Sequence, residues 1–162
     1  MNVDTLSDRP ASPYVIHGVT GLRERAGSSL GVSRWVTVDQ DSVTKFAELT
    51  GDRQWIHVDP DRARQGPFGA TVAHGFFTLS LSTDLLEDIF SVEDVNMILN
   101  YGLNRVRFPA PLPVGSRICM HASLAEALEI QGGIQVVYHL EYEIEGQAKP
   151  CCVADLVFRY ST

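Results

Sequence analysis

An aspartate and a histidine five residues apart are the clearest candidates for chemistry in this sequence. They are Asp52 and His57, the third and last residues of the segment TGDRQWIH at positions 50–57. A carboxylate and an imidazole, with ordinary pKa values of about 3.9 and 6.5, can share one water molecule, one group accepting its proton and the other orienting it. The pair alone also fits a turn that ends a helix, capped by the aspartate and followed by a solvent-exposed histidine.

A backbone N–H group is a second candidate. Residues 73–75 read AHG and directly precede a strongly apolar segment, so the N–H of Gly75 falls in or just before the first turn of a helix. Donors in that turn have no partner within the helix, and the positive end of the helix dipole faces outward there. Glycine also lets a ligand carbonyl approach closely. The N–H could stabilise an oxyanion formed on a polarised carbonyl such as that of a thioester, the alternative being a plain turn from loop into helix. For the adjacent His74, bracing this loop is a simpler role than contacting the substrate.

Helices on either side of a long loop must position these groups. We predict a helix over about residues 40–50, with Asp39 or Asp41 as its N-cap and Gly51 at its end. Residues 52–75 look irregular apart from one helical turn after Pro60, and loops of this length are often functional. Residues 75–90 are apolar on almost every face, which predicts a buried helix.

The second half of the chain predicts an antiparallel sheet. Strand patterns cover residues 97–108, 117–130, 134–144 and 150–160, with a hairpin turn at residues 132–133. The alternation in residues 134–144 gives one apolar face, which the buried helix would cover, so we expect an α+β fold. Residues 1–30 carry several prolines and glycines with little periodicity, which predicts a loop-rich lead-in to a single domain over residues 31–162.

The composition excludes several classes of protein. The 162 residues are 44% hydrophobic and 20% charged, which is typical of one globular domain. The 20 acidic and 13 basic side chains give a net charge of -7, which disfavours nucleic acid and anionic membrane surfaces as partners. The N-terminal segment MNVDTLSDRP has no apolar stretch of a signal peptide, and no apolar run approaches the roughly 18 residues of a membrane span. We therefore expect a cytoplasmic protein.

The cysteines indicate no disulfide framework and no metal site. The sequence has three cysteines, an odd number, and two of them are neighbours, so a reducing compartment fits best. The spacing of the cysteines also argues against a zinc site. Cys119, Cys151 and Cys152 lie in predicted strands and are best explained as small core or sheet residues. Apolar and polar residues alternate along the predicted strands, and His121 and His139 fall at polar positions, so we expect both to face solvent.

Three segments together resemble one family. The segment FAELTGDRQWIH at residues 46–57, with Ala63 six positions later, resembles the signature of the (R)-specific enoyl-CoA hydratases in the MaoC-like dehydratase family. AHG at 73–75 and YGLNRVRFPAP at 101–111 are similar to that family's helix entry and to its first strand after the helix. The resemblance runs from about Ser33 to the C-terminus. It implies a hot-dog fold, in which a curved antiparallel sheet wraps one long central helix, and a homodimer with active sites near the subunit interface.

The resemblance also implies a reaction. Asp52 and His57 would hold a water molecule for syn addition to the 2,3-double bond of an enoyl thioester, giving a (3R)-3-hydroxyacyl thioester. Either of the two could be the acid and the other the base, because the pair can titrate as a unit. Gly75 would be the oxyanion donor, and Thr83 falls where the family has a small hydroxyl residue in the pocket.

One pair of residues departs from the family pattern. Gln54 and Trp55 stand where Asn-Pro is usual. Gln54 keeps an amide that could orient the catalytic pair, while Trp55 could add a wall to the acyl channel.

The implied reaction needs no separate cofactor, since coenzyme A or the phosphopantetheine of an acyl-carrier protein is part of the substrate. Four arginines are candidates for binding its phosphates, and surface ion pairs are the alternative for each: Arg62, Arg64, Arg105 and Arg107. Two other functions stay open. One is a hot-dog subunit that binds acyl chains or shapes a partner's channel without chemistry, although such subunits generally lack the aspartate and histidine pair. The other is a hot-dog acyl-CoA thioesterase.

Overall fold

A computed structural model describes residues 13–162, so the first 12 residues of the expected lead-in lie outside the described part of the chain. Most of the strands belong to one sheet: β2 (Ser28–Val32), β3 (Val36–Thr37), β5 (Met97–Arg107), β6 (Arg117–Ile130), β7 (Gly133–Ile144) and β8 (Cys152–Ser161). All pairings in it are antiparallel, in the order β2-β6-β7-β8-β5, and β3 also pairs with β6. A separate parallel pair is formed by β1 (Tyr14–His17) and β4 (Phe90–Glu93).

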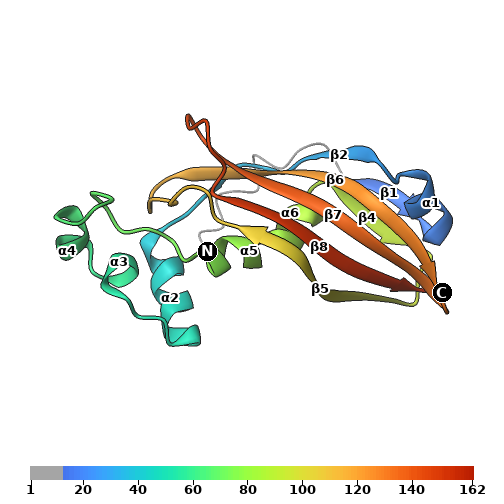
Figure 1. Cartoon of the computed structure of the whole chain (residues 1–162), viewed down its shortest axis with the longest axis horizontal. Coiled ribbons are helices and arrows are strands. Elements are labelled where there is room, and N and C mark those ends of the chain that lie inside the picture. The colour runs from blue at the N-terminus through green and yellow to red at the C-terminus, as the bar shows by residue number, and fades with distance from the viewer. Residues whose placement is uncertain (1–12) are drawn as a thin grey trace.

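The helices fall into three groups: α1 (Gly18–Glu24) near the N-terminus, α2 (Gln40–Thr50), α3 (Trp55–Val58) and α4 (Pro60–Arg64) in the middle, and α5 (Gly75–Ser80) and α6 (Ser82–Glu87) after them. Figure 1 shows α5 and α6 lying under the curved sheet, with α2, α3 and α4 grouped beyond its left-hand end. None of the helices within residues 13–162 is both long and apolar enough to cross a membrane. The arrangement is the α+β architecture implied by the sequence, with a curved antiparallel sheet around a central helical segment.

The inner face of the sheet has the predicted pattern. Alternate residues of β7 are buried between sheet and helices, from Val136 through Tyr138, Leu140 and Tyr142 to Ile144. Side chains in a strand alternate between the two faces, so one face forms the core and the other meets solvent.

The central helical segment differs from the single long helix that we expected, because it is interrupted at Leu81. The hydroxyl of Ser82 donates to the carbonyl of Leu79, and the Tyr142 hydroxyl donates to Ser82 Oγ over 2.9 Å. At the junction the Leu81 N–H bonds to Thr78 O, three residues back. A serine hydroxyl that bonds to a carbonyl of its own helix bends that helix, and a backbone hydrogen bond to the third residue back tightens the turn. Together these two bonds account for the interruption.

The N-terminal region also departs from expectation, because β1, α1 and the start of β2 occupy residues 14–30 in place of loops. Gly18 and Gly27 have φ angles of 61° and 78°, so these glycines make the tight turns between short elements. Ile16 and Leu22 are buried in the core. The described part of the expected lead-in is therefore less loop-rich than predicted and contributes side chains to the core.

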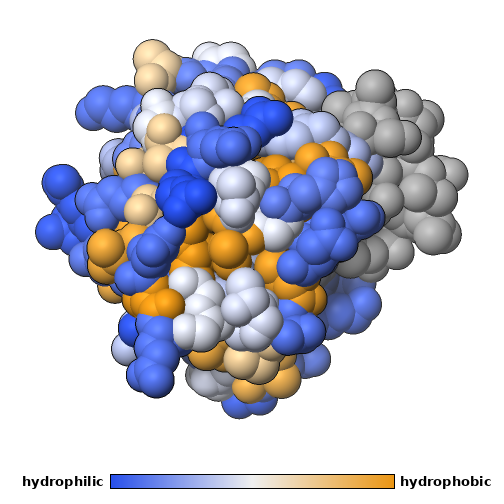
Figure 2. All heavy atoms as spheres, turned by 90° about the vertical axis from the view of Figure 1, so that its right-hand side faces the viewer, coloured by the Kyte–Doolittle hydropathy of each residue, from blue (hydrophilic) through white to orange (hydrophobic). Residues whose placement is uncertain are grey.

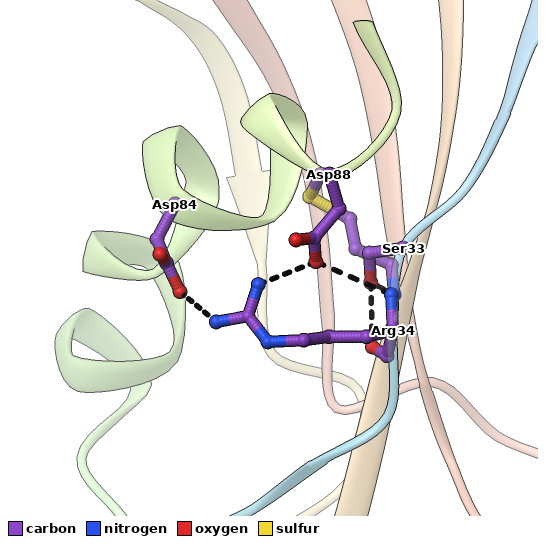
Figure 3. A network of polar contacts seen from close by, with 5 residues as sticks. Ser33, Arg34, Asp84 and Asp88 are labelled. Carbon is purple, nitrogen blue, oxygen red and sulfur yellow. Dashed lines mark hydrogen bonds and ion pairs between the residues drawn. The ribbon is translucent and has the colours of Figure 1, made fainter. Parts of the chain in front are cut away.

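Arg34, between β2 and β3, ties the edge of the sheet to α6. Its guanidinium donates to Asp84 and to Asp88, both over 2.5 Å (Figure 3). The exposed fractions of the side chains are 9% for Arg34, 2% for Asp88 and 42% for Asp84. The neighbouring Ser33 Oγ accepts a hydrogen bond from the Met120 N–H over 2.9 Å. This polar cluster fixes the C-terminal end of the central helical segment on the sheet.

Replacing Arg34 with methionine should destabilise the fold by about 3 kcal/mol, because the buried Asp88 carboxylate loses its guanidinium. Asp84→Asn is the matched control: it weakens the exposed half of the same cluster and should cost about 1 kcal/mol or less. Urea denaturation followed by circular dichroism measures both. Equal stability losses in the two variants would contradict the importance given to the buried pair.

Candidate active site

The chain enters the site directly after α2. Asp39 caps the start of this helix, its carboxylate accepting from the Ser42 N–H, and Gly51 ends it with a φ of 82°, as predicted. Left-handed backbone at the end of a helix favours glycine and turns the chain sharply. The turn places Asp52 immediately beyond the helix, with its side chain exposed. The following stretch is less irregular than we expected, because it contains α3 and α4, the latter capped by Asp59.

His57 lies in α3 and is 7% exposed. Its Nδ1 lies 2.6 Å from the carbonyl oxygen of Val72, and its own carbonyl accepts from Gln40 Nε2 over 2.7 Å. A carbonyl oxygen can only accept, so Nδ1 must carry the hydrogen in this contact. The neutral ring therefore has its lone pair on Nε2, which makes that nitrogen the proton acceptor.

His74, which precedes α5, supports this ring. Its Nε2 lies 2.9 Å from the backbone oxygen of Asp52, and its ring stacks on that of His57 with 3.7 Å between the centroids. By the same argument Nε2 carries the hydrogen. Its Nδ1 is buried and has no hydrogen-bond partner within residues 13–162. These contacts agree with a bracing role, and they also leave a second acceptor nitrogen beside His57.

The three side chains converge. A carboxylate oxygen of Asp52 and one ring nitrogen each of His57 and His74 lie within 4.8 Å of one another. A carboxylate and two imidazoles could hold a water molecule, and they are also ligands that transition metals accept. The sequence predicted the first two members of this cluster and expected no metal in the protein.

Gly75 is the first residue of α5, so its N–H lies in the turn whose donors have no partner within the helix. We expected its missing side chain to make room for a ligand. A Cβ atom at this position would lie 2.7 Å from the ring of Phe108, closer than real Cβ contacts, so the space above its Cα is filled by that ring. The glycine is therefore required by packing, and a ligand would have to reach the N–H from another side.

The side chains of the other predicted pocket residues are not part of the cluster. Gln54 is exposed, and its backbone carbonyl accepts from the His57 N–H over 2.9 Å. The Trp55 ring packs under Arg62 and against Gly66, within the α3–α4 region. Thr83 is eight residues beyond Gly75, roughly 12 Å along the helical segment. Its side chain lines a different cavity.

Two cavities flank β5 and the central helices. One, of about 300 Å³, is lined by Phe76, Leu79 and Leu103, among others. The other, of about 380 Å³, is lined by Thr83 and Phe158 with mainly apolar neighbours. Figure 2 views the right-hand end of Figure 1, and apolar side chains occupy the middle of this face between hydrophilic ones. The first cavity borders α5, and the second borders α6 and β4; both have apolar walls.

The four candidate arginines form two separate pairs. Arg62 and Arg64 lie on α4, where Arg62 stacks 4.5 Å above the Trp55 ring centroid and Arg64 bonds to Asp61 over 2.7 Å. Arg105 and Arg107 are two residues apart on β5, and both line a third cavity, of about 280 Å³. No single anion-binding cluster unites all four.

Several residues that position the site were not identified from the sequence. The Gln40 side chain joins His57 to Thr71, donating to the carbonyl of the former and accepting from the hydroxyl of the latter. The carbonyl of Val72 fixes the His57 ring. A carbonyl is present at every residue, so no sequence signal could have marked this one. Gln40 is the first residue of a predicted helix, and only its partners distinguish it from other glutamines.

Comparison with known proteins places this chain in a family. The family model described as "MaoC like domain" matches residues 22–144. A relative from Mycobacterium tuberculosis, named 3-hydroxyacyl-thioester dehydratase Z, is 50% identical over 143 residues, which cover 88% of this chain and 95% of the relative.

Solved structures show the same fold at low identity. A structure titled monoamine oxidase regulatory protein, from Archaeoglobus fulgidus, has a TM-score of 0.76 at 22% identity, covering 94% of this chain and 99% of that one. The R-hydratase PhaJ1 from Pseudomonas aeruginosa has a TM-score of 0.65 at 15% identity, covering 84% and 81%. The chain therefore belongs to the MaoC-like dehydratase family, has its hot-dog fold and is an enzyme of its hydratase and dehydratase class.

Proposed function

We propose that this protein catalyses the reversible syn hydration of trans-2-enoyl thioesters to (3R)-3-hydroxyacyl thioesters. The observation that carries the proposal is the convergence of the Asp52 carboxylate with the two histidine rings next to the start of α5. The relative with 50% identity, a named 3-hydroxyacyl-thioester dehydratase, supports the same substrate class.

In this reaction His57 Nε2 accepts a proton from water as the water oxygen bonds to C3 of the enoyl thioester. The Asp52 carboxylate accepts a hydrogen bond from the remaining O–H and so orients the water. The electrons of the double bond move toward the thioester oxygen, where the Gly75 N–H stabilises the negative charge. The protonated His57 then gives its proton to C2 from the same face, which makes the addition syn.

The tautomer of His57 supports this assignment, because its Nδ1–H is held by Val72 O and its lone pair is on Nε2. His74 is a positioning residue in this scheme: its ring stacks on His57, and its Nε2–H holds the backbone of Asp52. The two cavities beside β5 would receive the acyl chain, with Thr83 in the farther one. The exposed arginines of α4 and β5 would bind the phosphates of coenzyme A or of phosphopantetheine, which is part of the substrate.

Asp52→Asn and His57→Ala should each lower kcat for hydration of crotonyl-CoA by about 100-fold or more, since the first removes the carboxylate that orients the water and the second removes the base. Loss of the enoyl thioester absorbance measures the rate, and chiral analysis of the product tests the (3R) configuration. Asp41→Asn, an equivalent change at an exposed carboxylate of α2, is the control and should keep wild-type activity.

Wild-type turnover in either site variant would refute the assignment of these residues. No turnover by the wild-type homodimer would favour the non-catalytic subunit. Release of free thiol without loss of the double bond would favour the thioesterase.

Gly75→Ala should lower kcat/KM because the added methyl group displaces the Phe108 ring and shifts the start of α5. If the ring contact is the cause, Phe108→Ala in the same chain should restore much of the loss, since it removes the obstructing atoms. Steady-state kinetics of the two single variants and the double variant form a mutant cycle. Strictly additive losses would show that the glycine acts independently of this ring.

We further propose that the enzyme is a homodimer that pairs through β5. Within residues 13–162, β5 pairs only with β8, so its other edge is free. Five apolar residues of β5 are exposed, by 44% to 57%: Met97, Ile98, Leu99, Tyr101 and Leu103. An unpaired edge strand that exposes several apolar side chains is typical of an interface, and a second copy offers the same edge in return.

Leu103→Lys should shift the protein from dimer toward monomer, because it places a charge in the apolar edge. Leu128→Lys is the matched control, since Leu128 is 62% exposed on β6, away from β5, and this variant should stay dimeric. Analytical ultracentrifugation measures both. A monomeric wild type, or a Leu103 variant that stays dimeric, would contradict this interface.

A further inference from the structure

A second group of potential ligands lies on the outer face of the sheet, away from the central helices. Cys119 and His121 are two residues apart on β6, so their side chains point to the same side of the sheet. Glu143 lies directly opposite Cys119 on β7. The proposed reaction uses none of these residues. The spacing of the three cysteines argued against zinc, but this group contains only one cysteine and takes its other donors from two strands.

The three donor atoms form a compact triangle. Cys119 Sγ lies 3.9 Å from His121 Nε2 and 3.9 Å from Glu143 Oε2, and these last two atoms are 2.7 Å apart. A point equidistant from all three is about 2.1 Å from each. Zinc bonds measure about 2.0–2.2 Å to nitrogen and oxygen and about 2.3 Å to sulfur. An ion just outside the plane of the triangle would therefore reach all three atoms with movements of well under 1 Å.

The geometry does not suit a proton relay. In such a relay the thiol and the carboxylate contact opposite nitrogens of the imidazole. Here both face the same nitrogen, Nε2 of His121. Burial, and then the nearby charge of Glu143, raises the pKa of Cys119 to about 11, so the free thiol is a poor nucleophile at neutral pH. The cluster is arranged around a point, as ligands are arranged around an ion.

We propose that Cys119, His121 and Glu143 form a zinc site that joins β6 to β7, with the fourth position open to solvent. On binding, the thiol loses its proton to solvent, and the hydrogen of the neutral imidazole moves from Nε2, where the contact with the Glu143 carboxylate holds it, to Nδ1, so that Nε2 can bind the ion. A ligand set of thiolate, imidazole and carboxylate suits Zn²⁺ and disfavours Mg²⁺ and Ca²⁺, which prefer oxygen alone.

The surroundings favour entry of a cation. The side chains of His121 and Glu143 are 48% and 43% exposed, so solvent reaches the cluster past them, while Cys119 is 2% exposed beneath. Glu141 lies two residues before Glu143 on the same face of β7, and its charge attracts cations to this surface. Glu145, just beyond the end of β7, pairs with Arg117 over 2.8 Å. The site faces away from the active site and is independent of the proposed function.

Cobalt provides a readout that identifies the ligands, because thiolate bound to Co²⁺ gives a charge-transfer absorption in the near ultraviolet. Titrating the metal-free, reduced full-length protein with Co²⁺ should produce this band with one equivalent, and Zn²⁺ should abolish it. Cys119→Ser should remove the band, and His121→Ala and Glu143→Gln should weaken Zn²⁺ binding in calorimetry by at least about tenfold, the loss that even outer partners of a metal produce.

Two controls separate this site from other sources of binding. Glu145→Gln makes the same charge change just beyond the end of β7, where Glu145 pairs with Arg117, and should leave Zn²⁺ affinity within about twofold. Asp52→Asn alters the other cluster of possible ligands and should leave the cobalt band unchanged.

Absence of the band in the folded wild type, or its persistence in Cys119→Ser, would overturn the proposal. Because His121 is exposed, His121→Ala should fold even if the buried cysteine does not tolerate serine, and undiminished Zn²⁺ binding in this variant would also overturn the site. Circular dichroism confirms that each variant is folded before binding is compared.

Discussion

Two backbone carbonyl oxygens determine what the active-site histidines can do. A carbonyl only accepts hydrogen bonds, so Val72 O holds the hydrogen of His57 on Nδ1, and Asp52 O holds that of His74 on Nε2. Each ring is left with its lone pair on the other nitrogen. With the opposite tautomer, Nε2 of His57 would already carry a hydrogen and could not accept one from water. The proposed chemistry therefore depends on the position of the main chain as much as on the side chains.

That main-chain position comes from the packing of the domain. The Val72 N–H bonds to Ile56 O over 2.9 Å and the Ala73 N–H to Leu112 O over 2.8 Å, so this short segment is held between α3 and the approach to β6. His74 then leads directly into α5, whose continuation α6 is fixed to the sheet by the buried Arg34 and Asp88 pair. A site on loops thereby acquires the rigidity of the sheet and helices beneath it.

Local signals in the sequence were sufficient where the structure depends on neighbouring residues. The cap at Asp39, the stop at Gly51 and the alternation in β7 each act within a few residues, and all three are confirmed. The break at Leu81 could not be predicted in this way, because the Tyr142 hydroxyl that contacts the bend comes from a distant strand. The short elements of residues 14–30 were missed for the opposite reason, since turn residues are so frequent there that no periodicity develops.

The pairing of β6 with β7 shows how far a local departure can reach. Next to the hairpin turn, Ile130 pairs with Gly133, and continuing that register would place Ile144 opposite Cys119. The register shifts by one residue between Leu124 and Glu126, so that Glu143 lies there instead. A shift of one residue reverses which face each partner side chain points to, and an extra residue in one strand is the usual means of making it. Without this bulge an inward-facing isoleucine would take the register position of the carboxylate. The convergence of thiol, imidazole and carboxylate on the outer face therefore depends on a single irregularity that neither strand's own alternation reveals.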